Sequence, residues 1–247
     1  MHKYAIFVGL TACLSAPFGV MSSHAQAPDL SGIWMPLASL SEAWDHSALP
    51  LTQSAREALA SFDAERQDST YFCMPYGTPR NTLSTAPYSV EIIQTDAQLT
   101  VVFDRLGDVR RIFLDGRPHP DDPIPNWMGH SIGHWDAGTL VVETIAMTSE
   151  SILDAHGLPH SDAARLDERW QLVHKDDEQV LENRLSFTDP ANFDSPLTAV
   201  RYFRQAPFAE MSEGSSQCLM DQWRRQLEDI NRDLFREMQS SNAGELP

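Results

Sequence analysis

Short runs in which apolar and polar residues alternate recur along most of the chain, and such alternation is typical of β-strands with one buried face. From residue 89 onward, most of these runs are separated by only a few residues. We predict strands at 29–34, 89–95, 98–105, 108–114, 130–135, 139–147, 164–174, 178–188 and 197–205. Short links favour antiparallel neighbours, and about nine such strands favour closure into a barrel, which removes exposed sheet edges.

Two segments follow a helical period instead. Residues 52–68 carry apolar residues at helical spacing behind Thr52, which can cap a helix, and residues 217–238 carry a longer stripe of the same kind. We therefore expect a mainly β protein with one helix before the barrel and one C-terminal helix. No repeat or linker divides residues 28–247, so we expect a single domain.

The first 27 residues have the pattern of an export signal. A positive start is followed by the apolar run 5–12 and by small residues, so cleavage is expected after Ala25 or Ala27. A second interpretation is lipoprotein processing at Cys13. Either way, we expect a periplasmic or secreted protein. No later stretch reaches the ~18 apolar residues that a membrane span requires.

The composition and net charge argue against some classes of binding partner. The 247 residues are 42% hydrophobic and 21% charged, which is typical of a globular protein, and the formal net charge is −17. Such an acidic balance argues against nucleic acids and anionic membrane surfaces as partners. The expected partner is a small molecule, and the pattern leaves the oligomeric state open.

Two cysteines remain once the signal is removed, Cys73 and Cys218. In an oxidising compartment, two cysteines favour one disulfide, which would tie the segment before the first hairpin to the C-terminal helix. The alternative is two separate buried thiols.

Three stretches carry a family resemblance: Asp-Leu-Ser-Gly-Ile-Trp at 29–34, Leu-Asp-Gly-Arg-Pro-His-Pro at 114–120, and Gly-His-Ser-Ile-Gly-His-Trp at 129–135. Together with Thr-Leu-Val-Val-Glu-Thr at 139–144, they resemble a large, mostly uncharacterised group of exported bacterial proteins. The likeness covers most of the chain after the signal, and it implies export and a fold rather than a reaction. The Gly-x-Trp start is also similar to the first strand of lipocalin-like (calycin) barrels.

The strand at 164–174 carries one acid on an apolar face. Glu168 alternates there with Leu166, Trp170 and Leu172. Burial would raise the pKa of this carboxyl group toward the range of a general acid or base. The alternative is a position near the rim, paired with an arginine of the next strand. On that next strand, Asn183 is the lone polar residue of its face and could hydrogen-bond a ligand or Glu168 itself.

Histidines supply a possible partner for this acid. Alternation places His130 and His134 on one face of their strand, and His160 follows in a loop that could cover the barrel mouth. If that face points inward, we expect His130, Glu168 and His160 to form the catalytic group. The alternative is an outward face, or core histidines whose hydrogen bonds are satisfied.

Metal and cofactor chemistry are weaker interpretations. His130, His134 and His119, with Glu168 or Asp115, contain zinc-ligating side chains, but His130 and His134 would lie ~13 Å apart along a strand, too far to share one ion. The chain has no phosphate-binding glycine loop or dinucleotide motif. We predict neither a metal nor a cofactor.

Two functional interpretations remain. One is a cofactor-independent acid/base enzyme, of lyase, isomerase or hydratase type, acting on a hydrophobic aromatic or terpenoid-like molecule. The other is a non-catalytic carrier or sensor of such a molecule. In both, the predicted substrate-binding residues are Tyr76, Trp127, His134, Trp170, Asn183 and Arg201.

Overall fold

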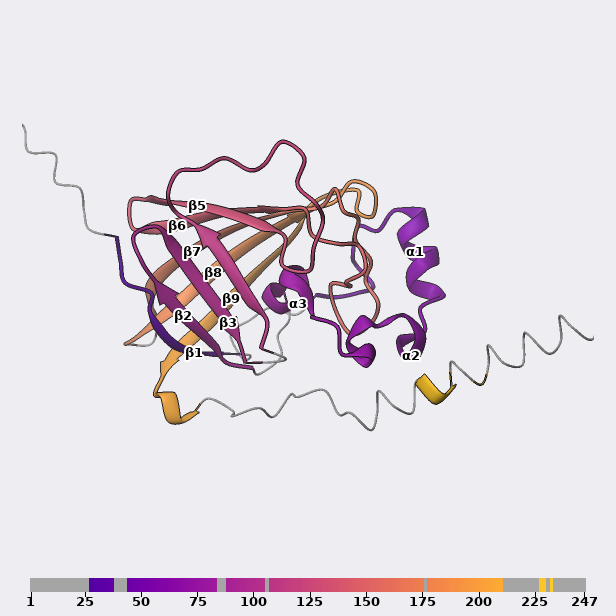
Figure 1. The fold of residues 1–247 in the computed structure, drawn as a ribbon, viewed down its shortest axis with the longest axis horizontal. Helices are drawn as coiled ribbons and strands as arrows, with labels where there is room; N and C mark the ends of the chain where they lie inside the picture. Colours follow the sequence, from indigo (N-terminus) through magenta and orange to yellow (C-terminus); the bar gives the residue numbers. More distant parts are fainter. Residues whose placement is uncertain are drawn as a thin grey trace, which may run out of the picture.

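The computed structural model of the chain describes residues 27–37, 44–83, 88–104, 107–175, 177–210, 227–229 and 232. Nine strands close into a barrel in sequence order (Figure 1), which confirms the predicted fold class. They are β1 (Gly32–Pro36), β2 (Val90–Gln94), β3 (Gln98–Phe103), β4 (Val109–Phe113), β5 (His130–Asp136), β6 (Thr139–Ile145), β7 (Arg165–Lys175), β8 (Glu178–Thr188) and β9 (Leu197–Ala206). Each predicted strand has its counterpart.

One pairing departs from the antiparallel expectation. β4 and β5 run parallel, with Ile112 opposite Ser131 and Phe113 opposite Ile132. A parallel pair cannot be joined by a hairpin, because the chain must return to the starting end of the sheet. Residues 114–129 make that return, and Figure 1 shows them as the long loop at the top of the view. The barrel is therefore mixed.

The β5–β6 hairpin closes with a tight turn. Asp136 pairs with Thr139, which leaves Ala137 and Gly138 as the loop. Their φ angles are +46° and +85°, as the two-residue turn that matches strand twist requires.

The predicted helix at 52–68 is split. Thr52 caps α1 (Gln53–Ala60), accepting a hydrogen bond from the Ala55 backbone N–H at 3.3 Å. The chain then restarts as α2 (Ala64–Gln67), because Asp63 accepts from the Glu65 N–H and begins a new helix. Three further short helical segments were not predicted: η1 (Ser69–Phe72), α3 (Gly77–Leu83) and η2 (Phe208–Glu210). Of the predicted C-terminal helix, only 227–229 and 232 lie within the described residues, and they are helical.

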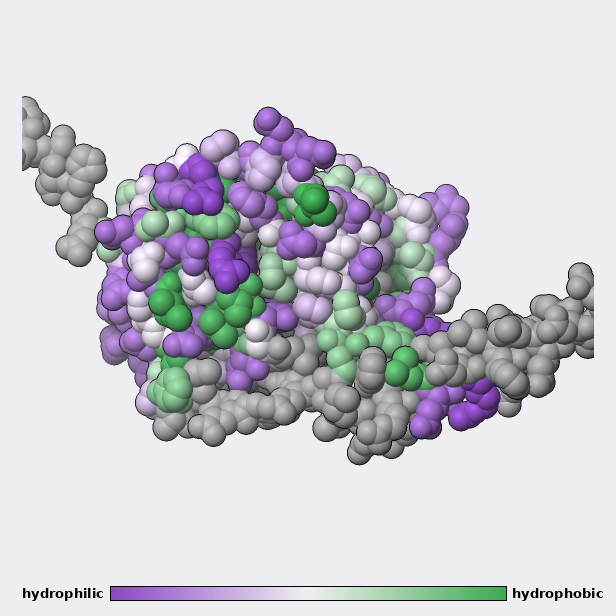
Figure 2. Space-filling view, viewed as in Figure 1, coloured by the Kyte–Doolittle hydropathy of each residue, from purple (hydrophilic) through white to green (hydrophobic). Residues whose placement is uncertain are grey.

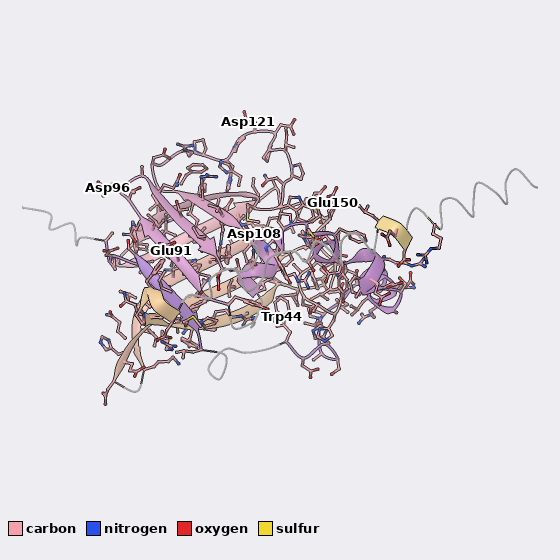
Figure 3. The ribbon with its side chains drawn as sticks, turned by 60° about the horizontal axis from the view of Figure 1, so that its bottom comes forward. Trp44, Glu91, Asp96, Asp108, Asp121 and Glu150 are labelled. Carbon is pink, nitrogen blue, oxygen red and sulfur yellow. The ribbon has the colours of Figure 1, made fainter. Side chains whose placement is uncertain are left out.

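Buried Asp108 docks α3 and the segment before it onto the end of the barrel. Its Oδ2 accepts from the Tyr76 backbone N–H at 3.0 Å and from Asn81 Nδ2 at 2.8 Å, and Figure 3 shows it beside the helix. Burial raises the pKa of Asp108, against hydrogen bonds that lower it. α3 is therefore attached to the barrel by polar contacts as well as by packing.

Two groups of buried apolar residues hold the domain together. One joins β1–β4 to β6, β7 and β8 inside the barrel and includes Trp34, whose Nε1 donates to the Leu30 carbonyl at 2.9 Å. The other joins α1 and the loops to β7–β9, and Leu166 and Phe187 are fully buried in it. Outside, Figure 2 shows hydrophilic side chains over much of the face in view, with small separate hydrophobic patches. None of the helices in the described part of the chain is long and apolar enough to span a membrane.

Candidate functional site

Glu168 lies inside the barrel, as its apolar strand face predicts. Only 1% of the residue is exposed. Its Oε1 accepts from Asn183 Nδ2 at 2.9 Å, and its Oε2 accepts from Arg110 Nη2. The alternative of a rim position paired with an arginine of the next strand is therefore wrong, because the partner comes from β4.

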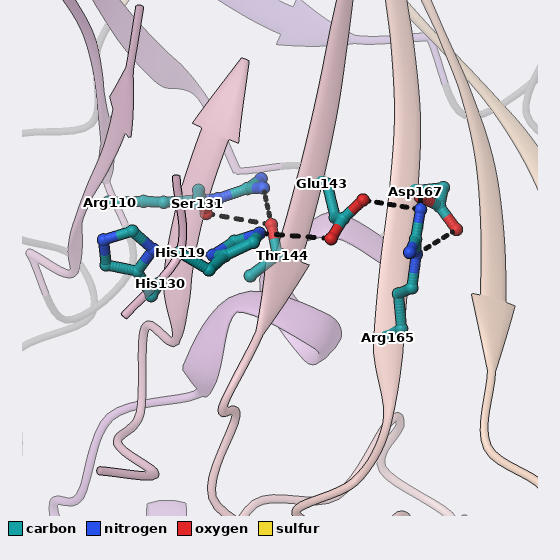
Figure 4. A network of polar contacts seen from close by, with 8 residues as sticks. All are labelled: Arg110, His119, His130, Ser131, Glu143, Thr144, Arg165 and Asp167. Atoms are coloured by element: carbon teal, nitrogen blue, oxygen red, sulfur yellow. Dashed lines mark hydrogen bonds and ion pairs between the residues drawn. The ribbon is translucent and has the colours of Figure 1, made fainter. Parts of the chain in front are cut away.

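Arg110 extends this contact into a network along the inner face of the barrel wall. Its Nε donates to Ser131 Oγ at 3.1 Å and its Nη2 to Thr144 Oγ1 at 2.7 Å (Figure 4). The two hydroxyl groups lie 2.9 Å apart. Buried side chains thus link β4, β5, β6, β7 and β8. We call Arg110, Ser131, Thr144, Glu168 and Asn183 the interior network.

The prediction from sequence missed Arg110 because it stands in a charged run, Val-Arg-Arg, at 109–111. One signal could have found it. Alternation puts Arg110 on the same strand face as Ile112, and Ile112 is a core residue.

Three buried polar atoms in this part of the barrel have no hydrogen-bond partner among the described residues: Arg110 Nη1, Trp170 Nε1 and Asn183 Oδ1. Trp170 pairs with Asn183 in the β7–β8 register, and both residues point inward. An unpaired buried donor or acceptor costs about 1–3 kcal/mol, so most native proteins satisfy such groups with protein, water or ligand. This part of the interior therefore has two donors and one acceptor whose hydrogen bonds are not made by the described residues.

His130 points the other way. Its neighbour Ser131 is buried in the interior network, and successive side chains on a strand face opposite sides. His134, four residues on, is exposed on the same outer face. The prediction that His130 and Glu168 share one cavity is therefore wrong. The inward-facing residue at this point of β5 is Ser131, whose small hydroxyl group fits beside the Arg110 guanidinium.

Outside the barrel, His130 begins a second chain of polar contacts. Its Nδ1 lies 2.7 Å from His119 Nδ1, and His119 Nε2 lies 3.3 Å from Glu143 Oε1. Glu143 is paired with Arg165 at 2.6 Å, and Arg165 with Asp167 at 2.7 Å (Figure 4). Burial lowers the pKa of both histidines. For His130 the neighbouring His119 and Arg117 lower it further, whereas for His119 the Glu143 carboxylate opposes the shift.

His160 is buried, and both of its ring nitrogens are engaged. Nε2 lies 2.8 Å from Ser151 Oγ, and Nδ1 lies 3.1 Å from the Ser161 carbonyl oxygen. Its ring packs edge-on against Phe187. Burial lowers the pKa of His160, partly offset by the contact with Ser161 and by nearby carboxylates. His160 is thus a core histidine with satisfied hydrogen bonds, which is the alternative that the sequence left open.

The predicted substrate-binding residues divide into two groups. Trp170 and Asn183 lie beside Glu168, and the Asn183–Glu168 hydrogen bond is one that the sequence indicated. Arg201 also points inward, because it is buried and lies opposite Asn183 in the β8–β9 register, and its Nε donates to the Leu83 carbonyl at 3.1 Å. The other three lie elsewhere. Tyr76 lies under the Arg80 guanidinium at 4.4 Å, the Trp127 carbonyl accepts from the Thr78 N–H at 2.9 Å, and His134 is exposed.

The Cys73–Cys218 disulfide stays a prediction, because Cys218 lies outside the described residues. Compared with models of known protein families and with curated protein sequences, the chain matches none.

Proposed function

We propose that the protein binds a small, largely apolar molecule with at least one oxygen group inside the barrel, as a carrier or sensor. The observation that carries this proposal is the set of three unpaired buried atoms, Arg110 Nη1, Trp170 Nε1 and Asn183 Oδ1, which have no partner among the described residues. A ligand that pairs with them recovers hydrogen bonds that the protein alone leaves unmade.

The chemistry of the ligand follows from these atoms. Arg110 and Trp170 offer N–H donors, and Asn183 offers an acceptor, so a hydroxyl or phenol group fits because it both accepts and donates. The surrounding wall is apolar, with Val142 and Leu181 buried beside the network. The expected ligand is therefore an aromatic or terpenoid-like alcohol or phenol.

A carrier role fits better than acid/base catalysis. The carboxylate of Glu168 has both oxygens engaged, one by the Arg110 guanidinium and one by the Asn183 amide. His130 lies across the wall, and His160 has both nitrogens engaged. The proton transfer partners predicted for a lyase or isomerase are thus not assembled around Glu168.

The test compares 1-naphthol with naphthalene, which differ by one hydroxyl group, by calorimetric titration of the full chain. We expect saturable binding of both, with 1-naphthol about tenfold tighter, since one hydrogen bond contributes about 1 kcal/mol or more. Trp170→Phe should remove most of that preference. Trp44→Phe is the matched control, because Trp44 Nε1 already donates to the Thr198 carbonyl at 3.1 Å. Failure of both compounds to bind, or a preference unchanged by Trp170→Phe, would contradict the proposal.

We also infer that the protein is exported, with residues 1–27 as its signal, and acts in the periplasm or outside the cell. The N-terminal pattern and the family resemblance support this, and a Cys73–Cys218 disulfide would suit that compartment. Cell fractionation with N-terminal sequencing tests export, and non-reducing peptide mapping tests the disulfide. Retention of residues 1–27 in a cytoplasmic product would count against export.

A further inference from the structure

Three potential metal ligands meet outside the barrel, in segments that do not contribute to the interior network. His46 precedes α1, whereas Asp154 and His156 belong to the connection between β6 and β7. One ligand atom from each lies within 4.8 Å of the others. His46 Nε2 lies 2.9 Å from Asp154 Oδ2, and His156 Nδ1 lies 3.9 Å from the same oxygen.

The loop holds Asp154 in a fixed orientation. Its Oδ1 accepts the backbone N–H groups of His156 at 3.0 Å and Leu158 at 3.2 Å. Leu153 and Leu158 are fully buried, and the Leu153 N–H donates to the Leu158 carbonyl at 2.9 Å. The loop is therefore closed on itself, and the second carboxylate oxygen, Oδ2, is directed at the two imidazoles.

Both segments are attached to the body of the protein. Gly157 has a φ of +89°, and a Cβ there would lie 2.1 Å from Phe62 Cγ, so the backbone of the loop packs directly on the Phe62 ring. On the other segment, the indole of Trp44 donates to the Thr198 carbonyl, and Trp44 also packs against the apolar core. His46 and His156 therefore face each other from anchored segments, with ring centroids 4.5 Å apart.

The two imidazoles converge on one oxygen, Asp154 Oδ2. Asp154 Oδ2 is buried and has no hydrogen-bond partner among the described residues, although His46 Nε2 is 2.9 Å away. Ligands that each lie ~2.0–2.2 Å from a tetrahedral ion are roughly 3–3.6 Å apart. The distances of 2.9 and 3.9 Å lie on either side of that spacing, so ion binding would require small rotations of the His46 and His156 side chains.

We propose that His46, Asp154 and His156 bind one divalent transition-metal ion, with zinc as the best match. Two imidazoles and one carboxylate form a three-ligand set that leaves a fourth tetrahedral position for water. The side chain of His156 is 73% exposed, so that position is open to solvent. The ion would connect the segment before α1 to the β6–β7 connection. This site is independent of the ligand proposed inside the barrel.

The test is titration of the full chain, carrying no histidine tag and freed of metal with a chelator, with Zn²⁺ alone at pH 7.5. We expect one saturable site and a higher melting temperature with zinc. His46→Gln and His156→Gln should each weaken binding at least tenfold. His156 is exposed, so its replacement leaves the fold intact, and His134→Gln, another exposed histidine, should bind zinc as the unmodified chain does.

Binding should also weaken in acid, because protons compete with the ion for imidazole nitrogens. The absence of saturable binding would overturn the proposal. So would unchanged binding in both His46→Gln and His156→Gln. Loss of binding in His130→Gln alone would place the ion on the His119–His130 pair and would overturn it equally.

Discussion

The Nδ1 atoms of His119 and His130 lie 2.7 Å apart on the outer face of the barrel. At that distance one nitrogen must donate and the other must accept, so at least one ring is neutral. His119 belongs to the 114–129 connection and His130 to β5. The pair therefore attaches the connection to the wall only while the rings are not both protonated.

This contact predicts a loss of stability in mild acid. The pKa of each histidine is below the ordinary 6.5 in the folded protein, so the unfolded chain takes up protons first as the pH falls. The stability that the two neutral histidines contribute is fully present above pH 6.5. It is lost as the pH decreases from 6.5 through their lowered pKa values. The urea concentration at the unfolding midpoint, measured from pH 8 to pH 5, should decrease below pH 6.5.

A double variant, His119→Gln with His130→Gln, should flatten part of that pH dependence. Some dependence should remain, because the pKa of His160 is also lowered by burial. His134→Gln, on the exposed part of the same strand face, is the control and should leave the curve unchanged. An unchanged slope in the double variant would show that the pair does not titrate as proposed.

The buried Arg110–Glu168 pair predicts strong non-additivity. Glu168→Leu or Arg110→Met alone should cost about 3–5 kcal/mol, because each leaves an uncompensated buried charge. The double variant should cost much less than the sum. The exposed Arg165–Asp167 pair is the comparison, and Arg165→Met should cost about 1 kcal/mol or less, since solvent screens it. Additive losses at Arg110 and Glu168 in chemical denaturation would argue against a coupled pair.

The same substitution should have a small effect at one tryptophan and a larger one at another. Trp170 Nε1 has no partner among the described residues, so Trp170→Phe removes an unsatisfied donor and should change the free energy of unfolding by less than ~1 kcal/mol. Trp34 Nε1 is bonded to the Leu30 carbonyl, so Trp34→Phe leaves that carbonyl unpaired and should cost about 1–3 kcal/mol. Thermal and urea unfolding measure both. Equal losses would mean that Trp170 has a partner in solution, such as an ordered water.

Gly157→Ala should be severe, at about 2–4 kcal/mol, because the added Cβ overlaps the Phe62 ring and the φ of +89° is strained for alanine. Gly116→Ala separates the two causes. Gly116 has a φ of +79°, but no described atom lies within 4 Å of the place that an alanine Cβ would take, so it should lose only about 1 kcal/mol from strain. Similar losses at both sites, measured by urea unfolding, would rule out the steric contribution at Gly157.

Alternation was enough to locate the strands, since buried strand faces repeat every second residue. It did not decide which face of β5 is inside. Both faces of that strand carry polar groups, so alternation left open whether His130 and His134 point inward or outward. The deciding contact is Arg110 with Ser131, which joins residues far apart in sequence. Such long-range polar pairing leaves no local pattern.

The parallel pairing of β4 with β5, which we call the seam, could not be predicted for a related reason. A strand has the same alternation whichever way its neighbour runs, and the length of the 114–129 connection was the one local sign of a crossover. The site was predicted in part. Glu168, Trp170, Asn183 and Arg201 point into the barrel, whereas the histidines that were grouped with them lie on its outer face or in the loop core.

The same seam has a consequence for how the wall moves. β4 and β5 meet through two paired positions, whereas β7 and β8 meet through eleven. Few backbone bonds hold the seam, so its amides should exchange with deuterium sooner than those of β7 and β8. Arg110 reaches across from β4 to side chains on β5, β6 and β7. Arg110 therefore contributes to holding β4 against β5, and Arg110→Met should speed amide exchange in these two strands before it affects β7 and β8.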